Sequence, residues 1–311
     1  MAELETTVMD RRDAENPTPK TPKRETRRFI ALRRFFRHRL ALIGTIILII
    51  MVLASIIAPL LDPQSPWTQH LTDTLAGPSA AHPLGTDDLG RDVLARLLYG
   101  GRISFVVGFG SMLISTTIGT LFGAISGFLG GAWDHLMMRF VDLMLSFPAI
   151  FLLLVVLNLL GGQASVALMV MYLGIFGWGG LARIVRAQVL SVKELDFIVA
   201  SRMGGARPWR ILARHVLPNI MAPVWVSTAF AMGGSMLAEA SLDFLGFGLS
   251  PSIPSWGNML DDAQNYIGSN PMMILIPGIT ITIAVVAINF VGDGLRDALD
   301  PQSSVGMQRI G

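Results

Sequence analysis

Long apolar runs alternate with short polar segments along most of this chain. A helix that crosses a bilayer needs roughly 20 predominantly apolar residues, and several runs reach that length. One uncharged stretch, residues 143–182, is too long for a single helix, and Gly161-Gly162-Gln163 predicts a break inside it. The pattern therefore predicts six membrane-spanning helices. Their expected positions are Leu40–Leu61, Ile103–Trp133, about Leu136–Leu160, about Ser165–Ala182, Val216–Ala238 and Met272–Gly292.

The charges between these runs predict which side of the membrane each connection faces, because cytoplasmic connections carry an excess of Lys and Arg. Residues 62–90 and 246–271 contain aspartates but no Lys or Arg. By contrast, seven arginines fall between residues 24 and 39, and residues 183–215 hold seven basic residues against two acidic ones. We therefore expect both termini and the 183–215 segment inside, and the two aspartate-containing loops outside.

The chain divides into five regions. Residues 1–39 are expected to form a cytoplasmic tail, disordered over its first 28 residues, which are polar and contain three prolines. The following apolar run starts too late and is too long for a cleavable signal. The other expected regions are the first transmembrane helix (40–61), an extracytoplasmic loop with an interfacial helix (62–102), a five-helix core that includes a cytoplasmic loop at 192–218 (103–292), and a cytoplasmic C-terminal tail (293–311).

Two basic groups of residues need separate explanations. The arginines just before the first span could indicate nucleic-acid binding, but their position favours retention on the cytoplasmic side and contact with anionic lipid. Arg91, Arg96 and Arg102 instead lie on the side expected to be outside. The apolar residues between them, at 93, 94, 97 and 98, fall on one helical face. We therefore expect a short interfacial helix that leads into the second span.

Small residues and prolines within the spans predict close contacts and kinks. Gly119, Gly123 and Gly127 recur at four-residue spacing, which lets two helices approach closely. That contact could lie inside this chain or against a partner subunit. Pro148, Pro223 and Pro277 fall within spans, where proline kinks or locally opens a helix.

Composition supports a membrane protein and argues against several kinds of chemistry. Hydrophobic residues make up 52% of the chain and charged residues only 15%, against about 25% charged in soluble domains. The absence of cysteine excludes disulfides, Cys-ligated zinc and thiol catalysis. No phosphate-binding G-x-x-x-x-G-K-[ST] loop, HExxH metal motif or GxSxG nucleophile motif occurs. The sequence therefore predicts that the chain is not an enzyme and binds no cofactor or metal.

The basic segment Glu194–Asn219 has a specific internal pattern. Residues 195–203 are compatible with a short helix, and Gly204-Gly205 favours a chain reversal, because glycine reaches positive φ at little cost. Pro208 suits the first turn of a second helix. Trp209 and Leu212 would then share one face of this helix. We expect a compact helical elbow with an apolar knob and a basic rim, shaped to fit a groove on a soluble partner.

Two alternatives to a docking elbow are open. A DNA-reading helix-turn-helix has a similar local pattern, but its recognition helix must reach a major groove, and here both ends return to the bilayer within a few residues. The segment could instead be a plain basic loop whose arginines only enforce topology. The spacing of Gly205, Pro208 and Leu217-Pro218 favours docking over that reading.

The elbow resembles the EAA loop of ABC importer permeases, which docks onto an ATPase subunit. Gly205, Leu217 and Pro218 match that pattern in register, and Ala200 matches within Val199-Ala200-Ser201. His215 stands where isoleucine is expected, as in the peptide permeases. Glu is missing from the usual Glu-Ala-Ala, and Glu194 or Asp196 could replace it. By this resemblance the ATPase-coupling residues would be Glu194, Asp196, Ala200, Arg202, Gly205, Ala206, Trp209, Arg214, His215, Leu217 and Pro218.

Further segments resemble the permeases of the dipeptide, oligopeptide and nickel group, most closely the C-type subunit of a dipeptide or oligopeptide importer. These segments are residues 82–108, 237–260 and 289–301. The resemblance implies an all-α polytopic fold like that of type I ABC importer permeases, in a bacterial or archaeal cell membrane. It also implies as partners a homologous permease, two ATPase subunits that carry ATP and Mg²⁺, and an extracytoplasmic binding protein, with no nucleic acid.

Three acidic residues near the membrane are candidates for the transport pathway. Asp142 lies near the start of the third span, and Glu239 and Asp243 lie near the outer end of the fifth. Burial of a carboxylate in the membrane is costly unless it is paired or wet. They could be helix-end residues facing water. Alternatively, Glu239 and Asp243 could line an outer vestibule and contact the amine of a peptide.

Two other functions are open at this stage. Within the importer interpretation, nickel or another small solute could replace the peptide. The alternative of another class is an ion-coupled secondary transporter acting alone, which typically shows inverted repeats and charges at the membrane midplane on broken helices. No convincing inverted repeat is visible, and the middle of each predicted span lacks charge. The importer is therefore the favoured interpretation.

Overall fold

The computed structural model describes residues 27–61, 64–160 and 164–299, which form helices and connections without a β-strand. Five helical segments are each long and apolar enough to cross a membrane. They are α3 (Arg39–Ile56), α5 (Val93–Leu129), α8 and α9 (Val166–Gly177 and Gly179–Val192), α11 to α12 (Pro208–Ile211 and Leu217–Phe244) and α14 (Met272–Leu299). Two further apolar helices, α6 (Gly131–Ser146) and α7 (Ala149–Leu160), meet at 78° and make a sixth span if the bent pair is counted as one. The expected all-α polytopic fold is therefore confirmed.

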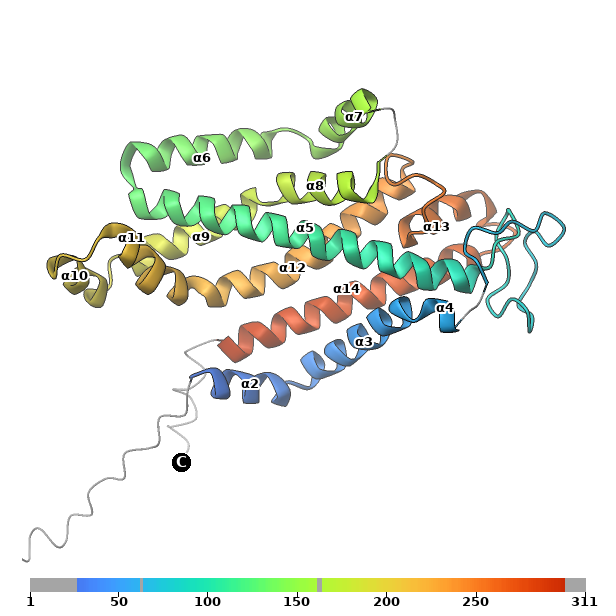
Figure 1. Cartoon of the computed structure of the whole chain (residues 1–311), viewed down its shortest axis with the longest axis horizontal. Helices are drawn as coiled ribbons and strands as arrows, with labels where there is room; N and C mark the ends of the chain where they lie inside the picture. The colour runs from blue at the N-terminus through green and yellow to red at the C-terminus, as the bar shows by residue number, and fades with distance from the viewer. Residues whose placement is uncertain (1–26, 62–63, 161–163, 300–311) are drawn as a thin grey trace, which may run out of the picture.

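The long helices lie side by side along the long axis of the molecule (Figure 1). α5 packs against α8, α9 and α12, and α14 packs against both α12 and α3. One end carries α2 (Arg27–Arg37) and the connection from α10 (Asp196–Met203) to α11. The other end carries α4 (Ala58–Leu61), α13 (Trp256–Ala263) with the 3₁₀ turn η2 (Gln264–Tyr266), and the irregular segment 64–92.

Buried side chains concentrate near both ends of the bundle. Trp256 of α13 packs among α5, α12 and α14, and its indole N–H donates to the Leu97 carbonyl at 2.8 Å. Ile198 and Ile211 of the opposite end pack against α9 and α12. Along α3, by contrast, large apolar side chains such as Ile50 point outward. In a protein of this composition such a face is what contact with lipid requires.

The glycine series of α5 packs against α9 inside this chain. A Cβ placed on Gly119, Gly123 or Gly127 would lie 2.9, 2.3 and 2.9 Å from the backbone oxygens of Trp178, Ala182 and Arg186, respectively. These distances are too short for a carbon–oxygen contact. The two helices therefore touch backbone to backbone, and the question left open by the sequence is settled in favour of packing within the subunit.

The expected short interfacial helix is not a separate element. Residues 93–102 are the first turns of α5, and Asp92 caps them by accepting from the Ala95 amide at 2.7 Å. Arg91 and Arg96 are also buried rather than lying at an interface. The prediction failed because it treated these arginines as exposed, whereas folded neighbours neutralise them.

Only one of the three span prolines breaks its helix. Phe147 has an extended ψ of 128° before Pro148, as expected because proline disfavours the helical conformation in the residue before it. Pro223 and Pro277 lie inside the continuous helices α12 and α14. The third predicted span is therefore two helices with a sharp bend.

Helices α9 and α14 extend beyond the predicted spans into regions expected to be a loop and a tail. α9 continues to Val192, so Arg183 and Arg186 belong to a helix rather than to a loop. α14 continues to Leu299, which makes the start of the expected C-terminal tail helical. Disorder was predicted for the first 28 residues, of which 1–26 fall outside the described part of the chain, as do residues 300–311. Arg27 and Arg28 instead begin α2.

Candidate functional site

The connection between α10 and α11 is a compact turn that its sequence specifies. Gly205 has a φ of +77°, a conformation that glycine adopts most easily. Its amide donates to the Arg202 carbonyl at 3.1 Å, and the Ala206 amide donates to the Ser201 carbonyl at 3.2 Å. This is the Schellman arrangement, which satisfies the last carbonyls of a helix. Pro208 then occupies the first turn of α11, so the expected helix, reversal and second helix are all present.

Buried apolar side chains fix this elbow, defined as residues 194–219, onto the end of the bundle. Ile198 of α10 and Ile211 of α11 are 0% and 1% exposed. They pack with Val185 and Val189 of α9, and Ala206 packs against the same cluster. A movement of the elbow must therefore carry α9 and α12 with it.

The face of the elbow that points away from the bundle is apolar with basic margins. Met203 and Trp209 are 85% and 59% exposed. Further exposed apolar side chains are Leu195, Phe197 and Val199. The exposed basic residues are Arg202, Arg207, Arg210 and Arg214. Such exposed apolar surface marks an interaction site, and its complement would be an apolar groove with acidic edges.

The structure corrects one detail of the expected knob. Leu212 is buried, so it does not share an exposed face with Trp209. Leu212–Val216 form a π-helical turn, η1, which changes the direction in which the following residues point. The apolar knob is instead made by Trp209 and residues of α10, chiefly Met203.

The π turn is a consequence of the Leu217-Pro218-Asn219 sequence. Pro218 has no backbone N–H, so it cannot donate to the Arg214 carbonyl as a helix would require. The Leu217 amide donates instead to the Leu212 carbonyl, five residues back. The side-chain amide of Asn219 donates to the His215 carbonyl at 2.6 Å. These two hydrogen bonds differ from those of a regular α-helix. They give the chain a locally irregular turn between α11 and α12.

All eleven residues predicted to couple to an ATPase lie on this elbow. Eight are exposed: Glu194, Asp196, Ala200, Arg202, Gly205, Trp209, Arg214 and Pro218. Three are partly buried: Ala206, His215 and Leu217. The exposed Phe197 and Met203 were not among the predicted residues. Their position on the same helix face as Ala200, at i±3, could have indicated them.

Polar contacts at the base of the elbow join α9 to α5 and α6. Arg186 donates to both carboxylate oxygens of Asp134 at 2.6 Å, and Asp134 also accepts from Ser126 at 2.5 Å. Lys193 donates to the carbonyl of Gly127 at 3.1 Å. The helix that enters the elbow is thereby attached to the end of the central helix.

Asp142 lies in an exposed ion pair. Its carboxylate accepts from Arg183 at 2.6 Å, and about half of each side chain is exposed. An exposed pair of this kind contributes about 0–1 kcal/mol. The pair joins α6 to α9, and substrate contact by Asp142 stays a prediction.

Glu239 and Asp243 do not line an open vestibule. Both are 1% exposed. Asp243 accepts from the Leu249 amide at 2.7 Å and from the Ser255 hydroxyl at 2.5 Å, and Ser104 lies 3.5 Å from Glu239. These carboxylates hold the connection from α12 to α13 against α5. Both carboxylates are buried rather than exposed at a vestibule. Folding places the Ser104 and Ser255 hydroxyls and the Leu249 amide next to them.

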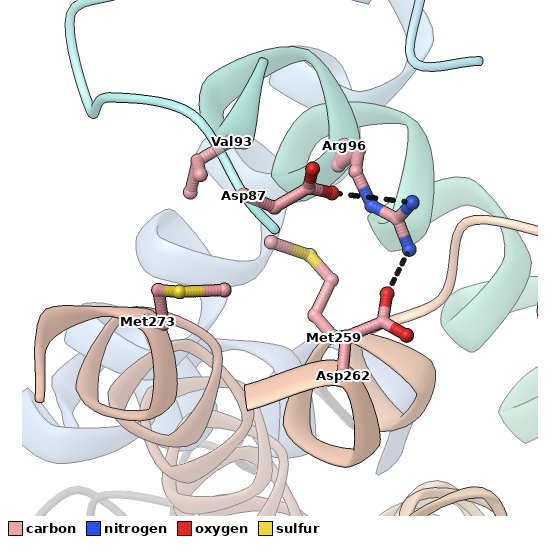
Figure 2. A pocket seen from close by; sticks show the side chains of 6 residues that line it. All are labelled: Asp87, Val93, Arg96, Met259, Asp262 and Met273. Carbon is pink, nitrogen blue, oxygen red and sulfur yellow. Dashed lines mark hydrogen bonds and ion pairs between the residues drawn. The ribbon is translucent and has the colours of Figure 1, made fainter. Parts of the chain in front are cut away.

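The N-terminal end of α5 contains an ion-pair cluster (Figure 2). Arg91 contacts Asp87 at 2.6 Å and Asp262 at 2.8 Å, and Arg96 contacts the same two aspartates at 3.5 and 2.9 Å. Burial raises the pKa of the Asp262 carboxyl above its ordinary value, and the guanidinium groups of Arg96 and Arg91 partly oppose this. Asp88 joins these carboxylates closely enough to hold a cation, but the two arginines already supply the positive charge.

A groove of about 290 Å³ lies where α5, α7, α8 and α12 converge. No charged side chain lines it. Its lining residues are Ser115, Ala149, Tyr172, Leu173, Phe176, Gly177, Ala231, Gly234, Ser235 and Ala238. The Tyr172 hydroxyl donates to the Ala149 carbonyl and so joins α8 to the start of α7.

The helical bundle with its projecting elbow defines the class of protein, a polytopic membrane permease. The chain belongs to the family described as binding-protein-dependent transport system inner membrane component, which residues 119–305 match. Residues 28–78 match the N-terminal transmembrane domain of oligopeptide transport permease C. It is therefore the multi-pass membrane component of an ABC importer. In this family ATP hydrolysis belongs to separate subunits, so the chain itself is not an enzyme.

Similar proteins agree with this membership. The dipeptide transport system permease protein DppC of Alkalihalophilus pseudofirmus is 40% identical over 88% of this chain and 89% of its own length. The oligopeptide transport system permease protein OppC of Haemophilus influenzae is 39% identical over 88% of each chain. A chain of the inward-facing MetNI methionine ABC transporter has a TM-score of 0.50 at 20% identity, covering 65% of this chain and 95% of that one. This last similarity concerns the fold alone.

Proposed function

We propose that this chain forms half of the translocation pathway of a dipeptide or oligopeptide importer. The proposed assembly contains a second, homologous permease, two ATPase subunits and an extracytoplasmic binding protein. Relatives named as dipeptide and oligopeptide permeases, similar over most of the chain, support the substrate class. ATP and Mg²⁺ would bind to the ATPase subunits, and this chain would supply no cofactor site.

The exposed apolar face of the elbow is the observation that carries the coupling proposal. An apolar projection fixed by buried side chains to α9 and α12 can transmit a displacement. In the proposed cycle, ATP binding closes the ATPase pair, the elbow follows, and the spans open the pathway outward. The loaded binding protein acts on the opposite end of the bundle. Nucleotide and substrate therefore act at two separate sites on one equilibrium, that between the closed and the outward-open arrangement of the spans. The charge distribution supports placing the elbow and both termini on the cytoplasmic side.

The uncharged groove is our proposed contribution of this chain to the pathway. Its small and hydroxyl-bearing lining can accept a peptide without selecting for side-chain charge. Glu239 and Asp243 are not proposed as pathway residues, because they already have partners in a buried position. Substrate selection is then left mainly to the binding protein.

A negative charge introduced on the apolar face of the elbow tests the coupling proposal. We expect Trp209→Glu to insert and assemble but to lose most of the ATPase stimulation produced by loaded binding protein, because a carboxylate would enter an apolar, acid-edged groove. Trp209→Phe is the matched control and should retain stimulation. Both are measured in the reconstituted importer. Normal stimulation in the Glu variant would contradict docking through this surface.

The same preparation distinguishes the remaining functions. Uptake of labelled dipeptide that requires ATP and the binding protein supports the proposal. Uptake driven by an ion gradient without the ATPase subunits would instead support a secondary transporter. Uptake of Ni²⁺ but not of peptide would assign the runner-up substrate.

A further inference from the structure

Helix α2 is a separate amphipathic element that precedes the first span. It ends at Arg37, and α3 begins at Arg39. Leu32 and Phe36 are 55% and 57% exposed and lie four residues apart, on one helical face. An apolar face of this kind on a helix outside the bundle core needs an apolar environment to cover it.

Exposed arginines border that apolar face. Arg33 and Arg37 are exposed and stand four residues apart, so they point in one direction beside Leu32 and Phe36. Within the described part of the chain, no acidic side chain forms an ion pair with either. Residues 27–61 contain no Asp or Glu at all. The helix therefore presents an apolar stripe and a positive edge together.

The orientation of α2 relative to the membrane-spanning helices is fixed. Its other face packs on α14: a Cβ on Gly294 would lie 3.2 Å from the Phe35 ring and 2.2 Å from the Ala41 side chain. His38, between the two helices, accepts from the Ala41 amide through Nδ1 at 3.1 Å and contacts Asp297 through Nε2 at 3.3 Å. Because the joint is held at three points, the stripe and the arginines face a defined direction next to the start of α3.

We propose that α2 lies on the bilayer surface and binds anionic phospholipid head groups through Arg33 and Arg37, with Leu32 and Phe36 inserted among the acyl chains. Two observations favour lipid as the occupant. The surface is continuous with the lipid-facing side of α3, and its charge is complementary to an anionic leaflet. The helix would fix the height of α3 and α14 in the membrane.

A single fluorophore can locate α2 relative to each lipid, since the chain has no cysteine of its own. An environment-sensitive label is attached at Leu32→Cys in the full-length chain reconstituted into bilayers of phosphatidylcholine and phosphatidylglycerol. Either lipid is brominated in turn as a short-range quencher. We expect quenching by both lipids, with brominated phosphatidylglycerol the stronger. A label at Ile50→Cys, on the outward face of α3, should be quenched equally by the two lipids.

Substitution of the arginines tests the head-group contact. A basic residue at an anionic surface contributes about 1 kcal/mol, so each of Arg33→Gln and Arg37→Gln should reduce the phosphatidylglycerol preference at the Leu32 label about fivefold. Arg296→Gln, an exposed arginine at the same end of the bundle on α14, should leave the preference unchanged. Raised salt should weaken the preference.

Either of two results would overturn the proposal. A Leu32 label that neither lipid quenches would show that the helix faces water or a protein partner. Equal quenching by both lipids, unaffected by the arginine substitutions, would show membrane contact without head-group binding. Both results are independent of transport activity, so they do not bear on the proposed importer function.

Discussion

Buried carboxylates in this protein are held by specific hydrogen-bond partners. The Asp243 carboxylate accepts hydrogen bonds from the Leu249 amide and the Ser255 hydroxyl. Ser255 in turn caps α13, because its hydroxyl oxygen accepts from the Asn258 amide at 3.0 Å. Close packing enforces this arrangement, because a Cβ on Gly257 would lie 2.6 Å from the Asp243 side chain. Asp243 thus binds two points of the connection from α12 to α13, at Leu249 and at Ser255.

Removing that carboxylate should destabilise the protein rather than alter substrate contact. Asp243→Ala leaves the Leu249 amide and the Ser255 hydroxyl without an acceptor, at a cost of about 1–3 kcal/mol for each unpaired group. We expect a clear decrease in the thermal unfolding temperature of the purified chain. Asp243→Asn retains one acceptor oxygen and should lose less.

Asp142→Ala is the surface control and should unfold at nearly the wild-type temperature, because its ion pair is exposed. A fully stable Asp243→Ala protein with impaired peptide uptake would contradict the structural role and return Asp243 to the pathway.

At the scale of elements, the π turn η1 joins α11 to α12 within the elbow. A π turn adds one residue to a helical turn, so the segments on its two sides are rotated relative to a regular helix. Here the turn depends on Pro218, which denies the Arg214 carbonyl its donor. The irregularity lies between the proposed docking surface and a membrane-spanning helix, where a rotation changes what the elbow presents.

Restoring the missing donor should regularise this turn. In Pro218→Ala the new amide can bond to the Arg214 carbonyl, and we expect α12 to extend toward α11 and to reorient the elbow. Basal ATPase activity should persist, while stimulation by loaded binding protein should fall severalfold. Asn219→Ala, which removes only the 2.6 Å bond to the His215 carbonyl, should have a smaller effect in the same assay. Unchanged stimulation in Pro218→Ala would show that the turn plays no part in coupling.

At the scale of the whole molecule, the elbow and the ion-pair cluster at the start of α5 occupy opposite ends of one bundle (Figure 1). The uncharged groove lies between them along the helices that connect the two ends. A movement of these helices at either end would therefore change the access of a solute to the groove.

Filling the groove should block transport without uncoupling the ATPase. A Cβ on Gly234 meets no atom within 4 Å, so Gly234→Trp can fold with its indole in the open space. We expect peptide uptake to fall at least tenfold while loaded binding protein still stimulates ATP hydrolysis. Ile50→Trp, on the outward face of α3, is the control for added bulk. Normal uptake by Gly234→Trp would exclude the groove from the pathway.

The sequence predicted the features that depend on local chemistry. Apolar run length located the five span-length helices and the bent pair α6–α7. Gly205 with Pro208 located the elbow, because backbone conformation at these residues is restricted whatever the surroundings. The same reasoning failed for Arg91, whose partner Asp262 lies 171 positions away. It also did not predict the burial of Glu239 and Asp243, since only folding brings Ser104 and Ser255 to them. The bend at Pro148 reaches 78°, because Phe147, the residue before the proline, is extended rather than helical.

The backbone contact between α5 and α9 means that the two helices would move together as one rigid pair. The glycines leave no gap for one helix to slide along the other, so a push at the elbow tilts both together. α5 has 37 residues and at 1.5 Å per residue is about 55 Å long. A tilt of about 5° at its inner end would therefore sweep the far tip through about 5 Å. A small stroke at one surface is thus amplified into a displacement as large as an amino-acid side chain at the other.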